Sequence, residues 1–260
     1  MVWVAASGEE NPGPLVVLVH GSMDRSGSWV RVARELRDRH TVRYDRRGYG
    51  RSRDIGPGSM EEHIADLFAV IAARPCVVAG HSYGAAVGLA AAERRPDLVQ
   101  AVVSFEGPMP WRDFWPATSG GANAVNEVRE SLCSGRPADA AIGDAAERFL
   151  RRHIGDEKWE SLPERTREDR RAEGAALLTE LSSAREDGAP YDASLIAVPV
   201  ISARGTESES YLMQGADVLA AEVPGAEHAV IEGANHGAHQ SHPAEFAGLI
   251  RRALDRIRAR

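Results

Sequence analysis

Short runs of apolar residues recur along the chain, and each is bounded by turn residues and followed by a stretch with helical spacing. This alternation is typical of a mostly parallel β-sheet with crossover helices. The clearest run, Leu15–Val19, is rich in β-branched residues and holds no polar residue, which predicts a central strand buried on both faces. The other predicted strands are Val2–Ala5 at a sheet edge, Thr41–Tyr44, Cys76–Ala79, Leu98–Phe105, Val198–Ile201 and His228–Ile231.

The stretches between these runs predict helices that flank the sheet. Ser59 stands before an acidic first turn, where its hydroxyl suits an N-cap, and Pro243 suits the first position of a helix. The predicted flanking helices are Ser28–Asp38, Met60–Ala73, Gly84–Arg95 and Pro243–Arg258.

Residues 110–193 interrupt the alternation, because they contain no convincing strand and are rich in Arg, Glu and Ala. A structureless loop of this length inside a compact domain is improbable, so the segment predicts a helical insertion. We expect an α/β core formed by residues 1–109 and 194–260, with residues 110–193 as a helical cap, or lid. The predicted helices of the cap are Ala122–Cys133, Ala138–Ile154 and Pro163–Arg185.

The charge balance limits the partners of the protein. Lys plus Arg number 31 against 38 Asp plus Glu, so the 260-residue chain has a formal charge of −7 at pH 7 and repels a phosphate backbone. The chain shows neither an apolar run of membrane-spanning length nor the pattern of a signal peptide. Two cysteines, Cys76 and Cys133, form no disulfide framework. We expect a cytoplasmic protein with no nucleic acid or membrane partner, and a homodimer is compatible with the sequence.

A candidate nucleophile lies directly after the predicted strand Cys76–Ala79. Gly80-His81-Ser82-Tyr83-Gly84 follows that strand and opens a helix of small residues. This is the G-x-S-x-G pattern in the strand–turn–helix setting that exposes a serine hydroxyl on a tight turn. The positive end of the helix stabilises negative charge that develops at the same point. Ser82 is therefore the predicted nucleophile.

A serine nucleophile needs a base, which in the chain order serine, acid, histidine comes after the last strand. His236 occupies this position, in the loop after His228–Ile231. His239 and His242 continue at a spacing of three residues, but no carboxylate or cysteine completes a metal site, so we expect no metal. His20 and His81 are expected to pack around the site.

The acid that orients the base has more than one candidate. An aspartate is sought in a turn after Val198–Ile201, but the sequence there has serine in its place, between Glu207 and Glu209. Glu106 ends the strand next to that of Ser82, and a right-handed crossover brings it to the same edge of the sheet. We favour Glu106 over Glu207 and Glu209.

Acyl transfer also requires two backbone donors for the oxyanion. The amide of Tyr83 is one, and the loop after Leu15–Val19 offers the amide of Ser22, or less favourably that of Met23. Aromatic side chains at the entrance of the cap indicate an apolar substrate, although Trp111 and Trp115, four residues apart, equally suit packing of the cap onto the core. The expected pocket residues are Met23, Tyr83, Met109, Trp111, Phe114 and Trp115.

These motifs together resemble those of the α/β-hydrolases, over nearly the whole chain except the cap. They are His20-Gly21-Ser22 with Trp29, the segment Asp45–Ser52, the Ser82 turn and the late His236. The resemblance implies a mostly parallel central sheet with flanking helices and a helical lid after strand 6, and it makes Asp45–Ser52 a structural turn. The missing aspartate is a departure from the family pattern.

Two short segments, Glu106–Pro108 and Asn235–Phe246, are similar to the fungal lactonases that open the macrocyclic lactone zearalenone. The resemblances imply a cofactor-independent serine hydrolase that cleaves a carboxylic ester or lactone of an apolar small molecule through an acyl-enzyme. The alternative is a non-hydrolytic protein with the same pocket, either a small-molecule receptor or a lyase. Brisk turnover of esters or lactones would exclude the receptor.

Overall fold

A seven-stranded sheet forms the centre of the protein in a computed structural model, which describes residues 1–259 apart from the side chain of Arg185. The strand order is β1-β3-β2-β4-β5-β6-β7, in which β1 is antiparallel to β3 and every other neighbouring pair is parallel. Residue 260, the last of the predicted core, lies outside the described residues. The strands are β1 Val4–Ser7, β2 Leu15–Val19, β3 Thr41–Tyr44, β4 Cys76–His81, β5 Val99–Phe105, β6 Val200–Gly205 and β7 Glu227–Ile231.

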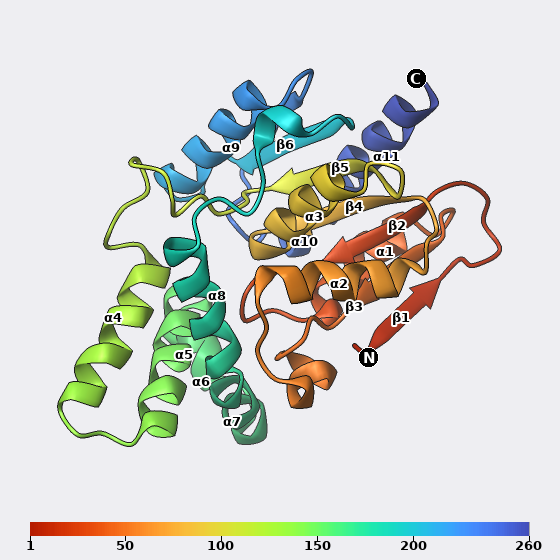
Figure 1. Ribbon diagram of the computed structural model, residues 1–260. Helices are drawn as coiled ribbons and strands as arrows, with labels where there is room; N and C mark the ends of the chain where they lie inside the picture. Colours follow the sequence, from red (N-terminus) through yellow and green to blue (C-terminus); the bar gives the residue numbers. More distant parts are fainter. Residues whose placement is uncertain (260) are drawn as a thin grey trace.

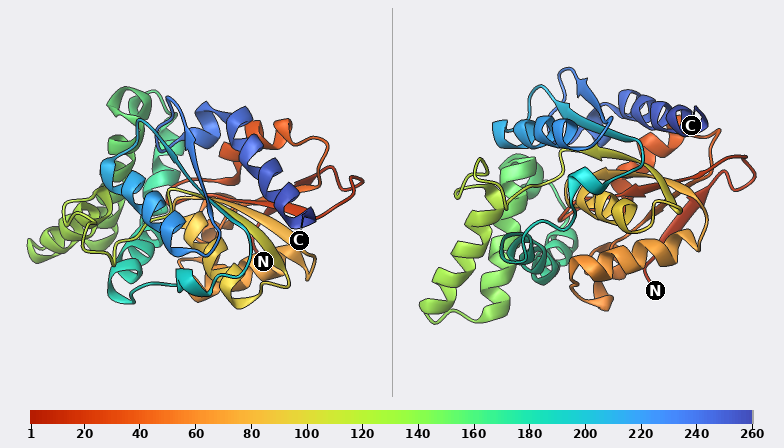
Figure 2. Two further views of the ribbon diagram at one scale, coloured as in Figure 1. Left: turned by 90° about the horizontal axis from the view of Figure 1, so that it is seen from above. Right: turned by 45° about the horizontal axis from the view of Figure 1, so that its top comes forward.

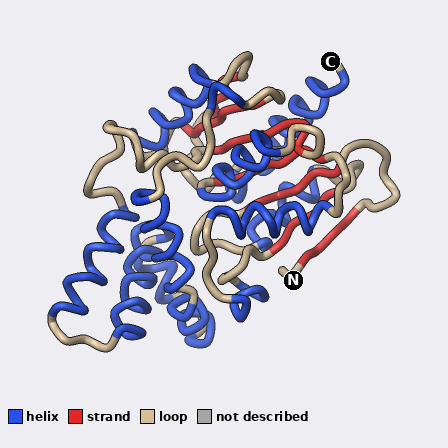
Figure 3. The backbone as a smooth tube through the Cα atoms, viewed as in Figure 1, coloured by secondary structure: helices blue, strands red, loops and turns tan. Residues whose placement is uncertain are grey.

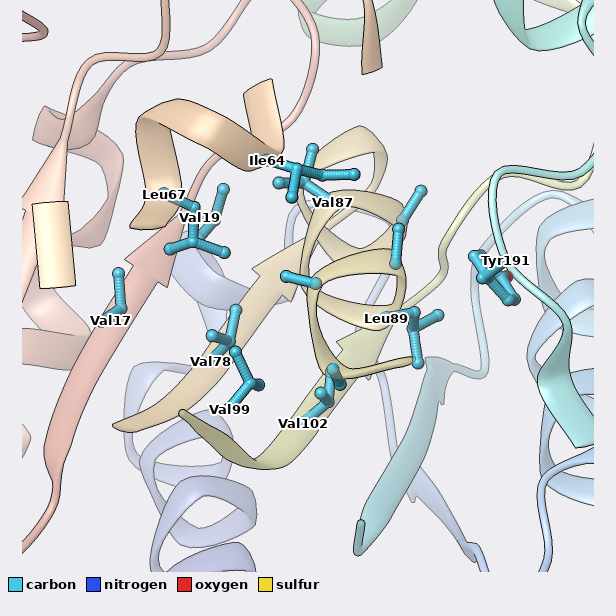
Figure 4. Packing of buried hydrophobic residues seen from close by; sticks show 14 of the residues in the cluster. Val17, Val19, Ile64, Leu67, Val78, Val87, Leu89, Val99, Val102 and Tyr191 are labelled. Atoms are coloured by element: carbon cyan, nitrogen blue, oxygen red, sulfur yellow. The ribbon is translucent and has the colours of Figure 1, made fainter. Parts of the chain in front are cut away.

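Strand β2 shows how the sheet divides the core into two layers. All five of its residues are buried. Val17 and Val19 belong to the cluster on one face, and Val16 and Leu18 belong to the cluster on the other face. The alternation of side chains along a strand thus buries an unbroken apolar run on both sides, as predicted for Leu15–Val19. Figure 4 shows the first cluster, where Val17, Val19 and Val78 of the sheet face helices α2 and α3.

Helices cover both faces of the sheet (Figures 1 and 2). Helices α2, α3 and α9 pack on the first cluster, and α1 and α11 pack on the second. Ser59 forms the predicted N-cap of α2, as part of a capping box with Glu62. The flanking helices are α1 Val30–Glu35, α2 Met60–Ile71, α3 Tyr83–Arg94, α9 Ser210–Glu222, α10 Ala238–Ser241 and α11 Pro243–Arg258, with short 3₁₀ helices η1 Ser26–Trp29, η2 Gly50–Ile55 and η3 Ala193–Leu195.

Five further helices join β5 to β6 and lie beside the ends of the parallel strands (Figure 1). Figure 3 shows the long loop that leads from β5 into the first of them. We call this group the helical insert. Its core includes Phe149, Trp159 and Leu177, which pack with Met23 and Tyr49 of the main body. The helices are α4 Gly120–Cys133, α5 Ala138–Ile154, α6 Asp156–Glu160, α7 Glu164–Ala172 and α8 Gly174–Glu186.

The structure corrects two details of the predicted insert. Its helices follow β5, the fifth strand of this chain. The family resemblance implied a lid after strand 6, and that numbering counts one more strand before the insert than this sheet has. The predicted helix Pro163–Arg185 is two helices, broken at Glu173, whose buried carboxylate accepts hydrogen bonds from Arg25 and from the amide of Gly50. The boundaries of the cap and its role as a lid stay predictions.

Two α-helices of the main body were not predicted. Helix α9 follows the loop that contains Glu207 and Glu209 and covers the β6 end of the sheet. Helix α10 is a single turn between the His236 loop and α11. Among the described residues, no helix is both long and apolar enough to cross a membrane.

Candidate active site

Ser82 lies on the sharp turn between β4 and α3. Its backbone has φ 53° and ψ −126°, a conformation that is uncommon for any residue other than glycine and that needs support from its surroundings. The amide of Ser82 donates to the carbonyl of Phe105 at 2.9 Å, which fastens the turn to the end of β5. The glycines of the motif permit close packing, because a Cβ at Gly80 would lie 2.4 Å from the carbonyl oxygen of Gly84.

Gly84 offers a stability test of this turn. An added Cβ would lie 2.3 Å from the carbonyl oxygen of Val19, so β2 or α3 must move. We expect Gly84→Ala to lower the free energy of unfolding by roughly 1–3 kcal/mol in urea titrations. The matched control is Gly248→Ala in α11, where nothing lies within 4 Å of the new atom. That change is expected to be neutral or to stabilise by up to about 1 kcal/mol, and equal losses in both variants would contradict the prediction.

Glu106 and His236 meet at the end of the sheet, although 130 positions separate them in sequence. The Nδ1 atom of His236 lies 2.6 Å from Oε2 of Glu106, and the Oε1 atom of Glu106 accepts from the amide of Gly205 at 2.8 Å. Glu106 is fully buried, and directly after β5 its backbone adopts the left-handed region with a φ of 48°. With Nδ1 bonded to the carboxylate, Nε2 of His236 is the ring atom left to exchange a proton.

The two alternative acids occupy a different environment. Glu207 and Glu209 are exposed in the loop after β6. The amide of Glu207 donates to the carbonyl of Ala234 at 2.9 Å, which ties this loop to the segment before His236 by its backbone. The carboxylate that contacts the imidazole belongs to Glu106.

The loop after β2 passes directly against the nucleophile. A Cβ at Gly21 would lie 2.8 Å from the Cβ of Ser82, so only glycine allows this approach. Ser22 follows, and Met23 adopts the left-handed region with φ 56°. Tyr83 opens α3, where the first amides of a helix have no partner within it. The amides of Ser22 and Tyr83 thus come from the two segments that adjoin Ser82.

Asp24, His81 and His239 form a second group beside the site, in which both histidines are buried and Asp24 is half-buried. Each offers one ligand atom, and these atoms lie within 4.8 Å of one another. These are not the three histidines that recur every three residues in the sequence, His236, His239 and His242; only His239 belongs to both sets. The Asp24 carboxylate already accepts from the amide of Arg25, from Ser28 and from His239, which makes it a cap of the following turn. We therefore describe the group as a cluster in which Asp24 and His239 are hydrogen-bonded and the ring of His81 packs against that of His239.

His81 connects this cluster to His236. Its ring centroid lies 4.3 Å from that of His239 and 4.5 Å from that of His236. Burial, followed by the neighbouring His239 and His236, holds the pKa of His81 well below its usual range. A neutral His81 therefore packs against the base without adding a positive charge beside it.

His20 packs beneath the loop, as expected. Its Nε2 atom accepts from the amide of Arg46 at 2.9 Å, and its Nδ1 atom lies 2.8 Å from the carbonyl oxygen of Gly21. Burial, and then the charge of Arg46, lower the pKa of His20 to about 4. The folded state therefore favours the neutral ring.

This lowered pKa of His20 gives a stability prediction. As the pH falls, the unfolded chain takes up a proton on His20 before the folded protein does. The contribution of neutral His20 to the free energy of unfolding is therefore complete above pH 6.5 and is lost as the pH falls towards 4. At pH 5 the loss from this group is roughly 2 kcal/mol. Urea titrations at pH 7.5 and pH 5 should show that His20→Gln loses about 2 kcal/mol less than the wild type over this range. Equal losses in the two proteins would contradict the assignment.

The predicted pocket residues are mostly engaged in packing. Met23 and Met109 are buried, and Phe114 packs against the first core cluster. Trp111 meets Tyr191 edge to face at 5.9 Å between ring centroids, and Trp115 meets Tyr211 at 4.6 Å. A surface hollow lined by Glu93, Arg94, Tyr191 and neighbouring residues contains neither Ser82 nor His236, so we assign it no role in the chemistry.

Sequence reasoning missed Glu180 of the insert, which is buried next to the loop after β2. Its carboxylate lies 2.5 Å from a guanidinium nitrogen of Arg46 and 2.5 Å from the hydroxyl of Ser22. The signal in the sequence was an acidic residue on the apolar side of a helix, three positions after Leu177 and next to Leu181. Asp45 was correctly placed in a structural turn, since its carboxylate accepts from the amides of Ser26 and Arg51.

The chain belongs to the alpha/beta hydrolase family, whose family model matches residues 16–249. The sheet order, the strained serine turn and the late histidine described above agree with this membership. The enol-lactonase from Burkholderia xenovorans LB400 has a similar fold, with a TM-score of 0.71 and 20% identity, covering 98% of this chain and 96% of that one.

Two relatives match in sequence over shorter stretches. Lipase LipV of Mycobacterium tuberculosis is 32% identical over 124 residues, which is 46% of this chain and 44% of the relative. The 2-(acetamidomethylene)succinate hydrolase of Mesorhizobium japonicum is 33% identical over 103 residues, covering 38% of this chain and 37% of the relative. The matches span less than half the length of these relatives.

Proposed function

We propose that the protein is a serine hydrolase that cleaves a carboxylic ester or lactone of an apolar small molecule through an acyl-enzyme. The observation that carries this proposal is the contact of His236 Nδ1 with the buried Glu106 carboxylate, beside the strained turn of Ser82. A serine, an imidazole and an orienting carboxylate are the groups that nucleophilic acyl transfer requires. Relatives named as a lipase and an enol-lactonase support the substrate class.

The reaction proceeds in two stages. Ser82 Oγ attacks the carbonyl carbon while Nε2 of His236 accepts the hydroxyl proton, and Glu106 orients the ring and stabilises its positive charge. The amides of Ser22 and Tyr83 donate to the oxyanion. His236 then gives the proton to the leaving oxygen, and water hydrolyses the acyl-enzyme by the same route. This chemistry needs no cofactor or metal from outside the chain.

A panel of p-nitrophenyl esters of increasing chain length, together with simple lactones, tests the proposal. We expect the wild type to hydrolyse members of the panel and Ser82→Ala, with an unchanged circular dichroism spectrum, to lose the activity. Folded wild-type protein without turnover on any member would favour the small-molecule receptor. Equal rates for wild type and Ser82→Ala would show that another group is the nucleophile.

A further inference from the structure

The carboxylate of Glu180 contacts side chains from three segments of the main body. Besides the Ser22 hydroxyl at 2.5 Å, it accepts from the hydroxyl of Tyr49 at 2.9 Å and pairs with Arg46 at 2.5 Å and with Nε2 of His63 at 3.3 Å. Arg46 and Glu180 are both buried. Because Glu180 lies on α8, these contacts attach the helical insert to the loop beside Ser82.

A second residue of the insert, Arg170, contacts the next residue of the same loop, Met23. The guanidinium of Arg170 on α7 donates to the carbonyl oxygen of Met23 at 3.0 Å. The Met23 side chain packs into the core of the insert with Phe149 and Leu177. Met23 also has the left-handed φ of 56°, which costs free energy and persists only where contacts enforce it.

The main body holds the opposite end of the loop through Arg46. Its Nε atom donates to the carbonyl oxygen of His20 at 2.8 Å, and its amide donates to the His20 ring. The loop from His20 to Met23 is therefore bound by Arg46 on one side and by the insert on the other, with Glu180 joining the two. The amide of Ser22 lies within this clamped stretch.

We propose that Glu180 is a positioning residue that holds the loop from His20 to Met23, which we call the oxyanion loop, against Ser82. Arg170 supports it in this role. The helical insert thus contributes to the geometry of the active site itself. The proposal rests on the proposed function, because it assigns the Ser22 amide to the oxyanion. The Ser22 hydroxyl belongs to the residue whose amide is the donor, and the Met23 carbonyl belongs to the next residue, so a loop freed at these two points changes the direction of the donor amide. Oxyanion stabilisation depends on donors fixed in direction before the charge develops.

Burial alone would raise the pKa of Glu180, but the charge of Arg46 and the hydrogen bond with His63 outweigh it and lower the pKa. The carboxylate therefore stays ionised at neutral pH. An ionised acceptor forms stronger hydrogen bonds than a neutral one, so the bond from Ser22 is a firm restraint on the loop.

The test compares Glu180→Gln with Glu186→Gln, an exposed glutamate on the same helix. With p-nitrophenyl butyrate, we expect Glu180→Gln to lower kcat by about 10–100-fold while KM changes less than about threefold, because the lost interaction acts on the transition state. The affinity for phenylboronic acid, whose serine adduct places an oxygen in the oxyanion site, should fall in parallel with kcat. Glu186→Gln should match the wild type in all three measurements.

Two further variants keep the proposal testable if Glu180→Gln folds poorly. Ser22→Ala removes the hydroxyl and keeps the amide, and Arg170→Gln removes the donor to Met23. Both should lower kcat and boronate affinity together, with little effect on KM. Unchanged kcat in the folded variants, relative to Glu186→Gln, would overturn the proposal.

Hydrogen exchange separates this proposal from the proposed function, since it needs no substrate. We expect the amides of residues 20–25 to exchange faster in Glu180→Gln than in Glu186→Gln. Equal exchange in the two variants would overturn the positioning role of Glu180. A wild type that neither hydrolyses esters nor binds the boronate would refute the serine hydrolase itself, whatever the exchange result.

Discussion

Replacing Glu106 by alanine is expected to lower kcat for ester hydrolysis by about 10³–10⁴-fold, the scale of the effect when the orienting acid of a catalytic triad is lost. Glu106 lies 2.6 Å from Nδ1 of His236 and is fully buried. Without it the ring loses the group that fixes its tautomer and stabilises its charge during the reaction. Steady-state kinetics with p-nitrophenyl esters, on protein checked for folding by circular dichroism, measures this effect.

Glu207→Ala is the matched control for Glu106→Ala. Glu207 is exposed in the loop after β6, and its contact with the His236 loop uses its own backbone amide. An alanine keeps that amide, so we expect kcat to change by less than about threefold, within the range of ordinary surface substitutions. The reverse ranking of the two variants would move the acid to the loop after β6.

Arg46→Met is expected to lower the free energy of unfolding by about 3–5 kcal/mol, because it leaves Glu180 buried without its charged partner. The side chains of Arg46 and Glu180 are 0% and 1% exposed, and Arg46 also donates to the carbonyl of His20. Arg46 further lies over the ring of Tyr83 at 4.9 Å, so packing is lost as well. Urea titration at pH 7.5 measures the change.

The control for this substitution is Arg95→Met, which removes an arginine whose ion pair with Asp97 is largely exposed to solvent. Exposed ion pairs contribute little because water screens them and both side chains lose freedom. We expect the unfolding midpoint of this variant to stay within experimental error of the wild type. Similar losses for Arg46→Met and Arg95→Met would show that the buried pair does not anchor the insert.

Local patterns predicted the sheet well because burial on both faces leaves a clear signal in the sequence. The strands Leu15–Val19 and Thr41–Tyr44 have the predicted boundaries, and the helix Ala138–Ile154 does as well. The break at Glu173 could not be predicted from the helix itself, since its cause lies in the contacts of that carboxylate with Arg25 and Gly50. Tertiary contacts there override a continuous helical pattern.

In the candidate site, too, one part could be predicted from the sequence and another could not. Topology alone brings Glu106 to the end of the strand beside Ser82, and the structure places it against His236. The contact between Ser22 and Glu180 joins residues 158 positions apart, and the position of the insert over the loop decides it. Sequence spacing carries no information on such a contact, although a glutamate on the apolar side of a helix marks a residue that needs a buried partner.

Labelling of the active wild-type protein with a fluorophosphonate, followed by peptide mass spectrometry, tests Ser82 as the nucleophile most directly. The reagent forms a stable adduct with an activated serine hydroxyl, so we expect one adduct per chain, located on Ser82, and loss of hydrolysis in proportion to labelling. His236→Ala should label far more slowly, because the base that activates the hydroxyl is gone. Protein that hydrolyses esters yet carries no adduct, or carries it on another residue, would contradict Ser82 as the nucleophile.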